Sequence, residues 1–188
     1  MNIFFLIYTL SWIVWVLLEF WIILRERKNE DKSKDKSTKR TILLSIFLAI
    51  IIGNVFANVR YLRIVGSFRS HLVIGVIVIW VGILFRFWAI QTLGRFYRTT
   101  VMIQEGHRVI KNGPYRILRH PSYAGSLLSI LGIAIGMSNW IGLILMLSMV
   151  FAAYRKRIIV EEKVLQESLG KEYQDYVKNT KKLVPFIY

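Results

Sequence analysis

The chain has 188 residues, 55% of them apolar and 20% charged, with 26 Lys and Arg against 11 Asp and Glu and hence a net charge of +15. This composition, with a mean hydropathy of +0.47, excludes intrinsic disorder, and nucleic-acid binding would explain the basic charge but not the long uncharged runs. The pattern is typical of a membrane protein whose loops face an anionic leaflet, and with no Cys the chain has neither a disulfide nor a cysteine nucleophile.

Four apolar stretches approach or exceed the roughly 20 residues of helix that a bilayer crossing requires. They are Ile3–Leu24, Thr41–Val59, Leu72–Ile90 and Tyr123–Tyr154. The first has neither a basic segment before it nor a cleavage site after it, so we interpret it as a retained helix and not as a signal peptide. The fourth is too long for one helix, and we interpret it as a helical hairpin that turns at Ser138 and Asn139. The sequence thus predicts an all-α, polytopic membrane protein with about five transmembrane helices, including a C-terminal helical hairpin.

The basic residues indicate the orientation of these helices. Twenty-two of the 26 lie in residues 25–40, 91–122 and 155–188, which five crossings would place on the same side. An excess of Lys and Arg marks the cytoplasmic side, so we expect a multi-pass protein with the N-terminus outside and the C-terminus in the cytosol. We expect one domain, 1–188: three transmembrane helices in 1–90, a cytoplasmic segment in 91–122, the hairpin in 123–154, and a cytoplasmic helix and tail in 155–188.

The segment Leu93–Tyr123 carries most of the polar detail. It is too polar for lipid and too rich in aromatic and β-branched residues for a plain linker. A turn is predicted at residues 112–114, and Pro121 suits the first turn of the following helix, where a proline loses no intrahelical hydrogen bond. We therefore expect a structured cytoplasmic pocket over the hairpin.

The residues after Tyr154 have apolar positions at helical spacing, which predicts an amphipathic helix continuing from the last span. Arg157 and Glu161 are four residues apart and would share one face of it. Gly170 predicts a break in this helix, and the apolar end 183–188 is expected to dock on the body of the protein.

Several motifs resemble those of the isoprenylcysteine carboxyl methyltransferase family. They are Gly94–Phe96, Ile103–Gly106, Gly113–Arg116, Arg119–Gly125, Arg157 with Glu161 and Glu162, Leu169–Tyr176 and Pro185–Ile187. The resemblance runs in order from residue 93 onward, whereas the first 90 residues match only as apolar helices. The block at 119–123 is less specific by itself, because phospholipid methyltransferases and membrane sterol reductases carry similar versions.

The resemblance implies that a methyl group passes from S-adenosyl-L-methionine, held in a cytoplasmic pocket, to a lipophilic acceptor arriving from the lipid bilayer. The acceptor group it favours is the carboxylate of an isoprenylated cysteine or a related isoprenoid or lipid. Arg157 would face the acceptor, and Arg157 and Glu161 are the catalytic candidates, with no metal. The residues expected to touch the cofactor are Gln104, a strand-like stretch of His107, Arg108, Val109 and Ile110, then Tyr115, His120, Pro121, Ser122, Tyr123 and Glu161.

These residue types suit the implied reaction. An acceptor carboxylate is already ionised at pH 7, so a cation that aligns it matters more than a base, and Arg157 can bind it bidentately. Glu161 can pair with the ammonium group of the methyl donor. A hydroxyl acceptor would instead need a base, for which His120 or Glu162 are the candidates.

Two other functions remain open at this point. An NADPH-dependent membrane reductase of an isoprenoid or sterol would share part of the block at 119–123, although no phosphate-binding Gly-rich motif is present. A non-enzymatic anchor that binds anionic lipid would explain the charge, but not the joint occurrence of Gln104, the block at 119–123 and the pair at 157 and 161.

Other conspicuous residues are interpreted structurally. Small residues at 125, 129, 132 and 136 form one helix face, which favours close helix packing. Glu19 and Arg86 lie near the ends of their spans, where either mutual pairing or extension toward the headgroups accounts for them. We expect Glu162 and Lys163 to face solvent.

Overall fold

The computed structural model describes residues 2–25, 36–57, 59–98 and 108–184. These residues form five α-helices and no strand, which confirms the all-α prediction. The helices are α1 (Ile3–Arg25), α2 (Lys36–Ala57), α3 (Phe68–Leu93), α4 (Pro121–Gly136) and α5 (Trp140–Asn179). Three short 3₁₀ helices, η2 (Arg60–Leu62), η3 (Gly94–Phe96) and η4 (Gly113–Arg116), lie between them.

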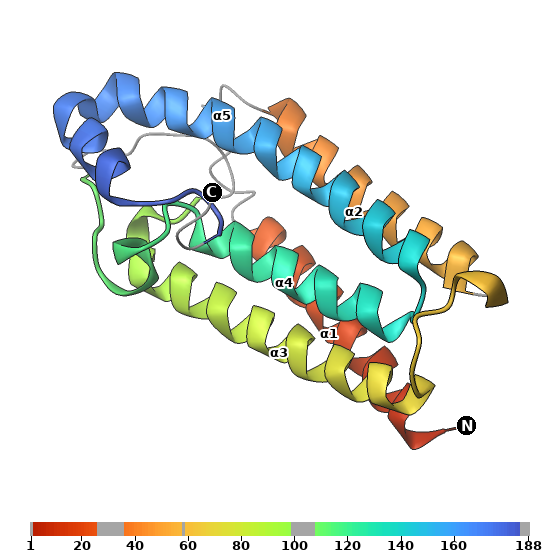
Figure 1. Cartoon of the computed structure of the whole chain (residues 1–188). Helices are drawn as coiled ribbons and strands as arrows, with labels where there is room; N and C mark the ends of the chain where they lie inside the picture. Colours follow the sequence, from red (N-terminus) through yellow and green to blue (C-terminus); the bar gives the residue numbers. More distant parts are fainter. Residues whose placement is uncertain (1, 26–35, 58, 99–107, 185–188) are drawn as a thin grey trace.

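The helices form two groups that lie along one another (Figure 1). In one group α3 packs along α4 and α1 packs against α3; in the other α2 packs along α5, and contacts between α4 and α5 join the two groups. The described parts of the connection between α3 and α4, residues 94–98 and 108–120, lie at one end of the bundle with the last part of α5, and the N-terminus lies at the opposite end. Sequence-distant polar segments therefore meet at a single end.

The predicted hairpin is present, with its turn at the predicted residues. Ser138 has a φ of 54°, and the Asn139 side chain accepts a hydrogen bond from the Gly142 N–H (3.0 Å), which caps the start of α5. Asn139 also donates to the Phe56 carbonyl at the end of α2 (2.7 Å). The turn thus fixes α2 against the hairpin as well as joining α4 to α5.

Among the described residues, two helical stretches are long and apolar enough to cross a membrane, Ile3–Ile22 and Phe68–Phe96. Arg40–Phe56 and Pro121–Gly136 are shorter apolar helices. Length and composition therefore identify two spans directly, and the count of five crossings stays a prediction.

Small residues bring the backbones of α3 and α4 into contact. A Cβ atom on Gly132 would lie 2.6 Å from the Ile79 nitrogen, and one on Gly75 would lie 2.7 Å from the Gly132 carbonyl oxygen. A Cβ atom on Gly136 would collide with the Tyr8 ring of α1. The structure confirms the helix-packing interpretation of the small-residue face at 125, 129, 132 and 136.

A matched pair of glycine substitutions tests this packing. Gly132→Ala should lower the apparent unfolding temperature in detergent by several degrees, because overpacking costs about 1–3 kcal/mol. Gly142→Ala should leave it unchanged or raise it slightly, since the nearest atom to its added Cβ is 3.7 Å away and alanine is the better helix former. Equal unfolding temperatures for the two variants, measured by differential scanning fluorimetry, would contradict the close approach.

Candidate active site

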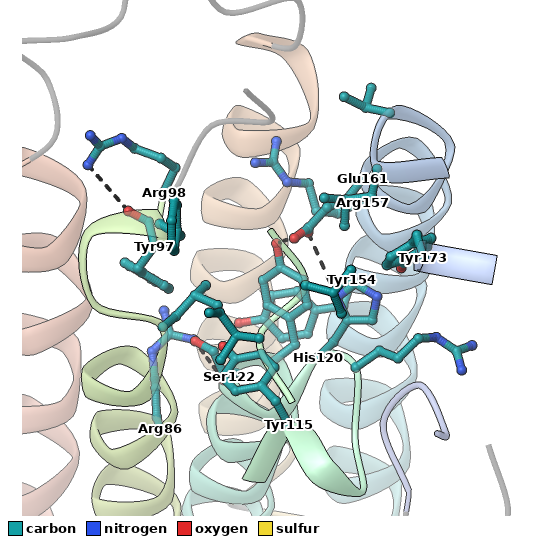
Figure 2. A pocket seen from close by; sticks show the side chains of 18 of the residues that line it. Arg86, Tyr97, Arg98, Tyr115, His120, Ser122, Tyr154, Arg157, Glu161 and Tyr173 are labelled. Atoms are coloured by element: carbon teal, nitrogen blue, oxygen red, sulfur yellow. Dashed lines mark hydrogen bonds and ion pairs between the residues drawn. The ribbon is translucent and has the colours of Figure 1, made fainter. Parts of the chain in front are cut away.

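A cavity of about 160 Å³ lies at the end of the bundle where α4 begins (Figure 2). One ordered water needs about 10–15 Å³ on a comparable measure, so the space is large enough for an organic ligand. One wall is apolar and comes from Ile42, Leu43 and Ile46 of α2. The start of α4 and the middle of α5 contribute the polar lining. The cavity therefore presents both kinds of surface to one bound molecule or pair of molecules.

Nine of the predicted site residues line this cavity: Arg108, Val109, Ile110, Tyr115, His120, Ser122, Tyr123, Arg157 and Glu161. Pro121 does not line it, because it is the fully buried first residue of α4 and serves to begin that helix. Gln104 and His107 lie outside the described residues. Residues 108–110 have irregular backbone, so the strand-like expectation is wrong for them.

Arg157 and Glu161 lie one turn apart on α5 and both line the cavity, as their spacing predicts. Arg157 is only 2% exposed. The Tyr123 hydroxyl donates to Glu161 Oε2 (2.8 Å) and also interacts with the Arg157 guanidinium. A buried cation and a carboxylate are thus held on one wall by a shared tyrosine.

Three rings stack beside this pair. The centroids of His120 and Tyr123 are 5.7 Å apart with an interplanar angle of 16°, and those of Tyr123 and Tyr154 are 4.9 Å apart at 21°. The Tyr154 hydroxyl is 2.7 Å from Ser126 Oγ. Stacking and hydrogen bonds together leave the polar wall little freedom to rearrange.

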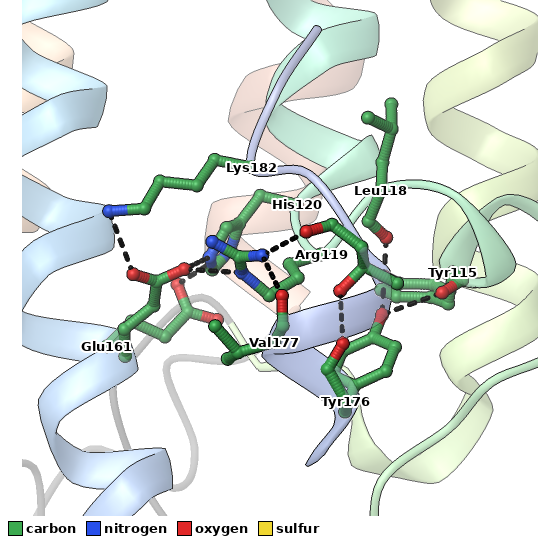
Figure 3. A network of polar contacts seen from close by, with 10 residues as sticks. Tyr115, Leu118, Arg119, His120, Glu161, Tyr176, Val177 and Lys182 are labelled. Carbon is green, nitrogen blue, oxygen red and sulfur yellow. Dashed lines mark hydrogen bonds and ion pairs between the residues drawn. The ribbon is translucent and has the colours of Figure 1, made fainter. Parts of the chain in front are cut away.

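Glu162 does not face solvent, so that prediction is wrong, whereas Lys163 is exposed as expected. Arg119 Nε donates to Glu162 Oε1 (2.8 Å) and Lys182 Nζ to Oε2 (3.0 Å), while His120 Nε2 lies 3.3 Å from Oε1 (Figure 3). The side chain is 17% exposed. The reason lies in the tertiary structure, because these two cations and the imidazole ring come from segments that are distant in the sequence and return to α5.

The partners of Glu162 determine its charge. Burial by itself would raise the pKa of this carboxyl, but the hydrogen bonds from His120, Arg119 and Lys182 outweigh burial and lower the pKa to about 2. Glu162 is therefore a carboxylate at any physiological pH and accepts hydrogen bonds only.

The predicted break at Gly170 is confirmed, since this residue has a φ of 54° within α5. Beyond the break, the Tyr176 hydroxyl donates to the Tyr115 carbonyl (2.7 Å) in η4 (Figure 3). A left-handed conformation costs a glycine little, so the helix can turn back there over the connection between α3 and α4.

The C-terminal segment docks beside the start of α4. The Arg119 N–H donates to the Lys181 carbonyl (2.7 Å), and the His120 N–H donates to the Lys182 carbonyl (3.0 Å). Leu183 is 3% exposed. The predicted docking is confirmed as far as Leu183, and residues 185–188 lie outside the described residues.

Glu19 and Arg86 also line the cavity, from α1 and α3. Arg86 Nη2 lies 2.7 Å from Glu19 Oε2, and Arg86 Nη1 donates to the Ser122 carbonyl (2.9 Å). Mutual pairing therefore accounts for these two charges. From the sequence, Glu19 and Arg86 stand out only as charged residues within predicted spans. The structure shows in addition that both line the cavity.

Among the residues that the structure describes, three buried polar atoms at the cavity lack a hydrogen-bond partner: Arg86 Nε, Ser122 Oγ and Tyr173 Oη. Leaving such a group unsatisfied costs about 1–3 kcal/mol, so these atoms are suited to bind a polar ligand. Burial, followed by the nearby Glu162 and Glu161 carboxylates, raises the pKa of Tyr173, which therefore keeps its hydroxyl proton. The residues present fit a ligand with several hydroxyl, amine and carboxylate groups.

This fold has a counterpart among solved structures. A structure titled as the eukaryotic intramembrane Ras methyltransferase, isoprenylcysteine carboxyl methyltransferase, matches 96% of this chain and 65% of its own chain, with a TM-score of 0.64 and 23% identity. The likeness establishes a shared fold. The described residues also include two helices that are long and apolar enough to cross a membrane, as the membrane prediction requires.

The family is shown by sequence. A family model described as phospholipid methyltransferase matches residues 70–172, which is more than half of the chain, so the protein belongs to this family. Relatives include a probable protein-S-isoprenylcysteine O-methyltransferase of Oryza sativa subsp. indica, 29% identical over 61% of each chain. Another is protein-S-isoprenylcysteine O-methyltransferase B of Arabidopsis thaliana, 33% identical over 60% of this chain and 58% of that one. The alignments span about three-fifths of these relatives, whose names confirm the resemblance inferred from the motifs.

The low pKa of Glu162 has a consequence for stability against acid. Because its pKa of about 2 lies below the ordinary 4.5, its stabilisation is present above about pH 4.5 and is lost as the pH falls toward 2. Glu162→Gln should therefore lower the free energy of unfolding by about 1–3 kcal/mol at neutral pH and flatten the decline between pH 4.5 and 2. The control is Glu167→Gln, an exposed acid of the same helix. Unfolding temperatures of wild type and Glu162→Gln that fall in parallel would count against the assignment.

Proposed function

We propose that this protein transfers a methyl group from S-adenosyl-L-methionine to a lipophilic acceptor at the cytoplasmic face of the membrane. The acceptor group is a carboxylate, that of an isoprenylated cysteine or of a related isoprenoid or lipid. The observation that carries the proposal is the cavity itself, which is lined both by buried Arg157 and adjacent Glu161 and by apolar residues of α2. The names of the relatives support it.

The polar wall suits the methyl donor, which supplies an activated methyl group on a sulfonium. Glu161 is the group that would hold the donor's ammonium, and the unpartnered Ser122 and Tyr173 hydroxyls are suited to its other polar groups. The faces of Tyr115 and the stacked Tyr123 offer flat surfaces for an aromatic base.

Arg157 would bind the acceptor carboxylate. Its guanidinium is almost fully buried, where a charge-assisted bidentate contact is strong and an ammonium point charge would not replace it. Holding the reacting atoms in near-attack geometry can contribute about 7–11 kcal/mol to catalysis, so alignment is sufficient and no base is required.

A hydroxyl acceptor is a poorer fit. Glu162, one candidate base for such an acceptor, is engaged by Arg119, Lys182 and His120, and its pKa of about 2 makes it a weak proton acceptor. The contacts of Glu162 therefore favour an acceptor that arrives already ionised.

The proposed function includes an orientation of the chain in the membrane. With five crossings, the end of the bundle that holds the cavity faces the cytosol, together with 22 of the 26 basic residues. The whole chain, 1–188, then acts as one domain with its N-terminus outside.

Ligand binding separates this function from the reductase and the anchor. Calorimetric titration of the detergent-purified protein should show saturable binding of S-adenosylhomocysteine and none of NADPH. Binding of NADPH alone would identify a reductase. If neither compound bound, the non-enzymatic anchor would be the function that remains. Both results would overturn the proposal.

Arg157 and Glu161 should have separate roles, the first toward the acceptor and the second toward the methyl donor. Arg157→Ala should reduce methyl transfer to a prenylated cysteine analogue by at least about a hundredfold while S-adenosylhomocysteine affinity stays within a few-fold, because Arg157 binds the acceptor. Glu161→Gln should weaken S-adenosylhomocysteine binding by about tenfold or more. Equal losses of cofactor affinity in both variants would refute this division.

A further inference from the structure

The ring of His120 lies between two neighbouring carboxylates of α5. Its Nε2 is 3.3 Å from Glu162 Oε1, and its Nδ1 is 3.9 Å from Glu161 Oε2. Its side chain is 3% exposed and its ring stacks on Tyr123. The orientation of the imidazole is therefore fixed, and each ring nitrogen faces a different acid.

The contact with Glu162 decides which nitrogen carries the proton. Arg119 and Lys182 also donate to Glu162, and the carboxyl stays ionised, so it has no proton to give. His120 Nε2 must then be the donor, and in a neutral imidazole Nδ1 keeps its lone pair. A neutral ring thus presents an acceptor to Glu161, next to a second acceptor, and this is the form of the ring that the inference concerns.

Two acceptors that face each other need a donor between them. Their separation of 3.9 Å is too long for a direct hydrogen bond, yet it fits two bonds of about 2.7–3.0 Å that converge on one nitrogen. An ammonium group has several N–H donors and no acceptor, so it can satisfy both atoms at once. Glu161 Oε2 also accepts from Tyr123, which fixes the position of that oxygen.

We propose that Glu162 is a positioning residue that holds His120 in its Nε2–H tautomer, so that His120 Nδ1 and Glu161 together accept hydrogen bonds from one ammonium group. This rests on the proposed function, because the ammonium is that of the methyl donor. Glu162 then acts without touching the ligand: its role passes through the ring of His120.

The neighbouring acids give a matched test. In protein labelled with ¹⁵N-histidine, assigned with a His120→Asn variant, NMR at pH 8 should show the Nε2–H tautomer for ligand-free His120. Glu162→Gln should reduce the preference of His120 for the Nε2–H tautomer, since a neutral amide oxygen accepts more weakly than a carboxylate, and should raise the Kd for S-adenosylhomocysteine about tenfold or more. Glu161→Gln should raise the same Kd but leave the tautomer as in wild type.

Lys182→Met is the control for a general loosening of the contacts around Glu162. Lys182 Nζ binds Glu162 Oε2, whereas His120 Nε2 lies against Glu162 Oε1. It should change neither the tautomer nor the Kd by more than about twofold. An Nδ1–H or doubly protonated His120 in wild type, or an unchanged tautomer in Glu162→Gln, would overturn the inference. Failure of wild type to bind S-adenosylhomocysteine, with the tautomer as expected, would instead overturn the proposed function and with it the identity of the ammonium.

Discussion

The buried ion pair between Glu19 and Arg86 is the interaction on which the arrangement of this protein depends. It joins α1 to α3, and Arg86 extends it to α4 through the Ser122 carbonyl. Ser126 of α4 donates to Glu19 and contacts the Tyr154 hydroxyl of α5, so four helices meet at one polar cluster. Removing one charge from a low-dielectric interior costs about 3–5 kcal/mol, because the other charge remains there unpaired. None of these four helices can shift relative to the others without breaking this cluster. The cluster therefore fixes the geometry of the cavity beside it.

The start of α4 is held from two sides as a result. Inside the bundle, Arg86 holds the Ser122 carbonyl, while at the end of the bundle the C-terminal segment holds the N–H groups of Arg119 and His120. Tyr123 directly follows these anchored residues in the chain and donates the hydrogen bond to Glu161. A site that must align two reacting groups gains from such support, since alignment within about half an ångström depends on the residues behind the contacting side chains. The bent end of α5 thus stabilises the site as well as covering it.

The sequence predicted the helices well, because long apolar runs, the small-residue face and the break at Gly170 are local signals. It placed Arg157 and Glu161 correctly, since a spacing of four defines one helix face. The same spacing continues through 165 and 169, which also line the cavity, but the break at Gly170 interrupts it before Tyr173, so helical spacing does not predict the place of Tyr173. Glu162 was misjudged for a different reason. Its partners are Arg119, His120 and Lys182, which reach it only through the return of two distant segments, and no local pattern encodes that return.

The balance of buried charge agrees with the proposed reaction. At the cavity Arg86 is paired with Glu19, and Arg157 is accompanied by Glu161, so these four groups sum to zero. S-adenosyl-L-methionine carries a net charge of +1 from its sulfonium, ammonium and carboxylate, and an acceptor carboxylate carries −1. Methyl transfer between these two molecules combines a net charge of +1 with one of −1 and leaves a neutral thioether and a neutral ester, so no charge has to enter or leave the cavity. A hydroxyl acceptor would leave an uncompensated positive charge in a poorly solvated space until a proton departs, which low dielectric penalises. An anionic acceptor is therefore the better fit to the proposed reaction, because no proton has to leave the cavity during it.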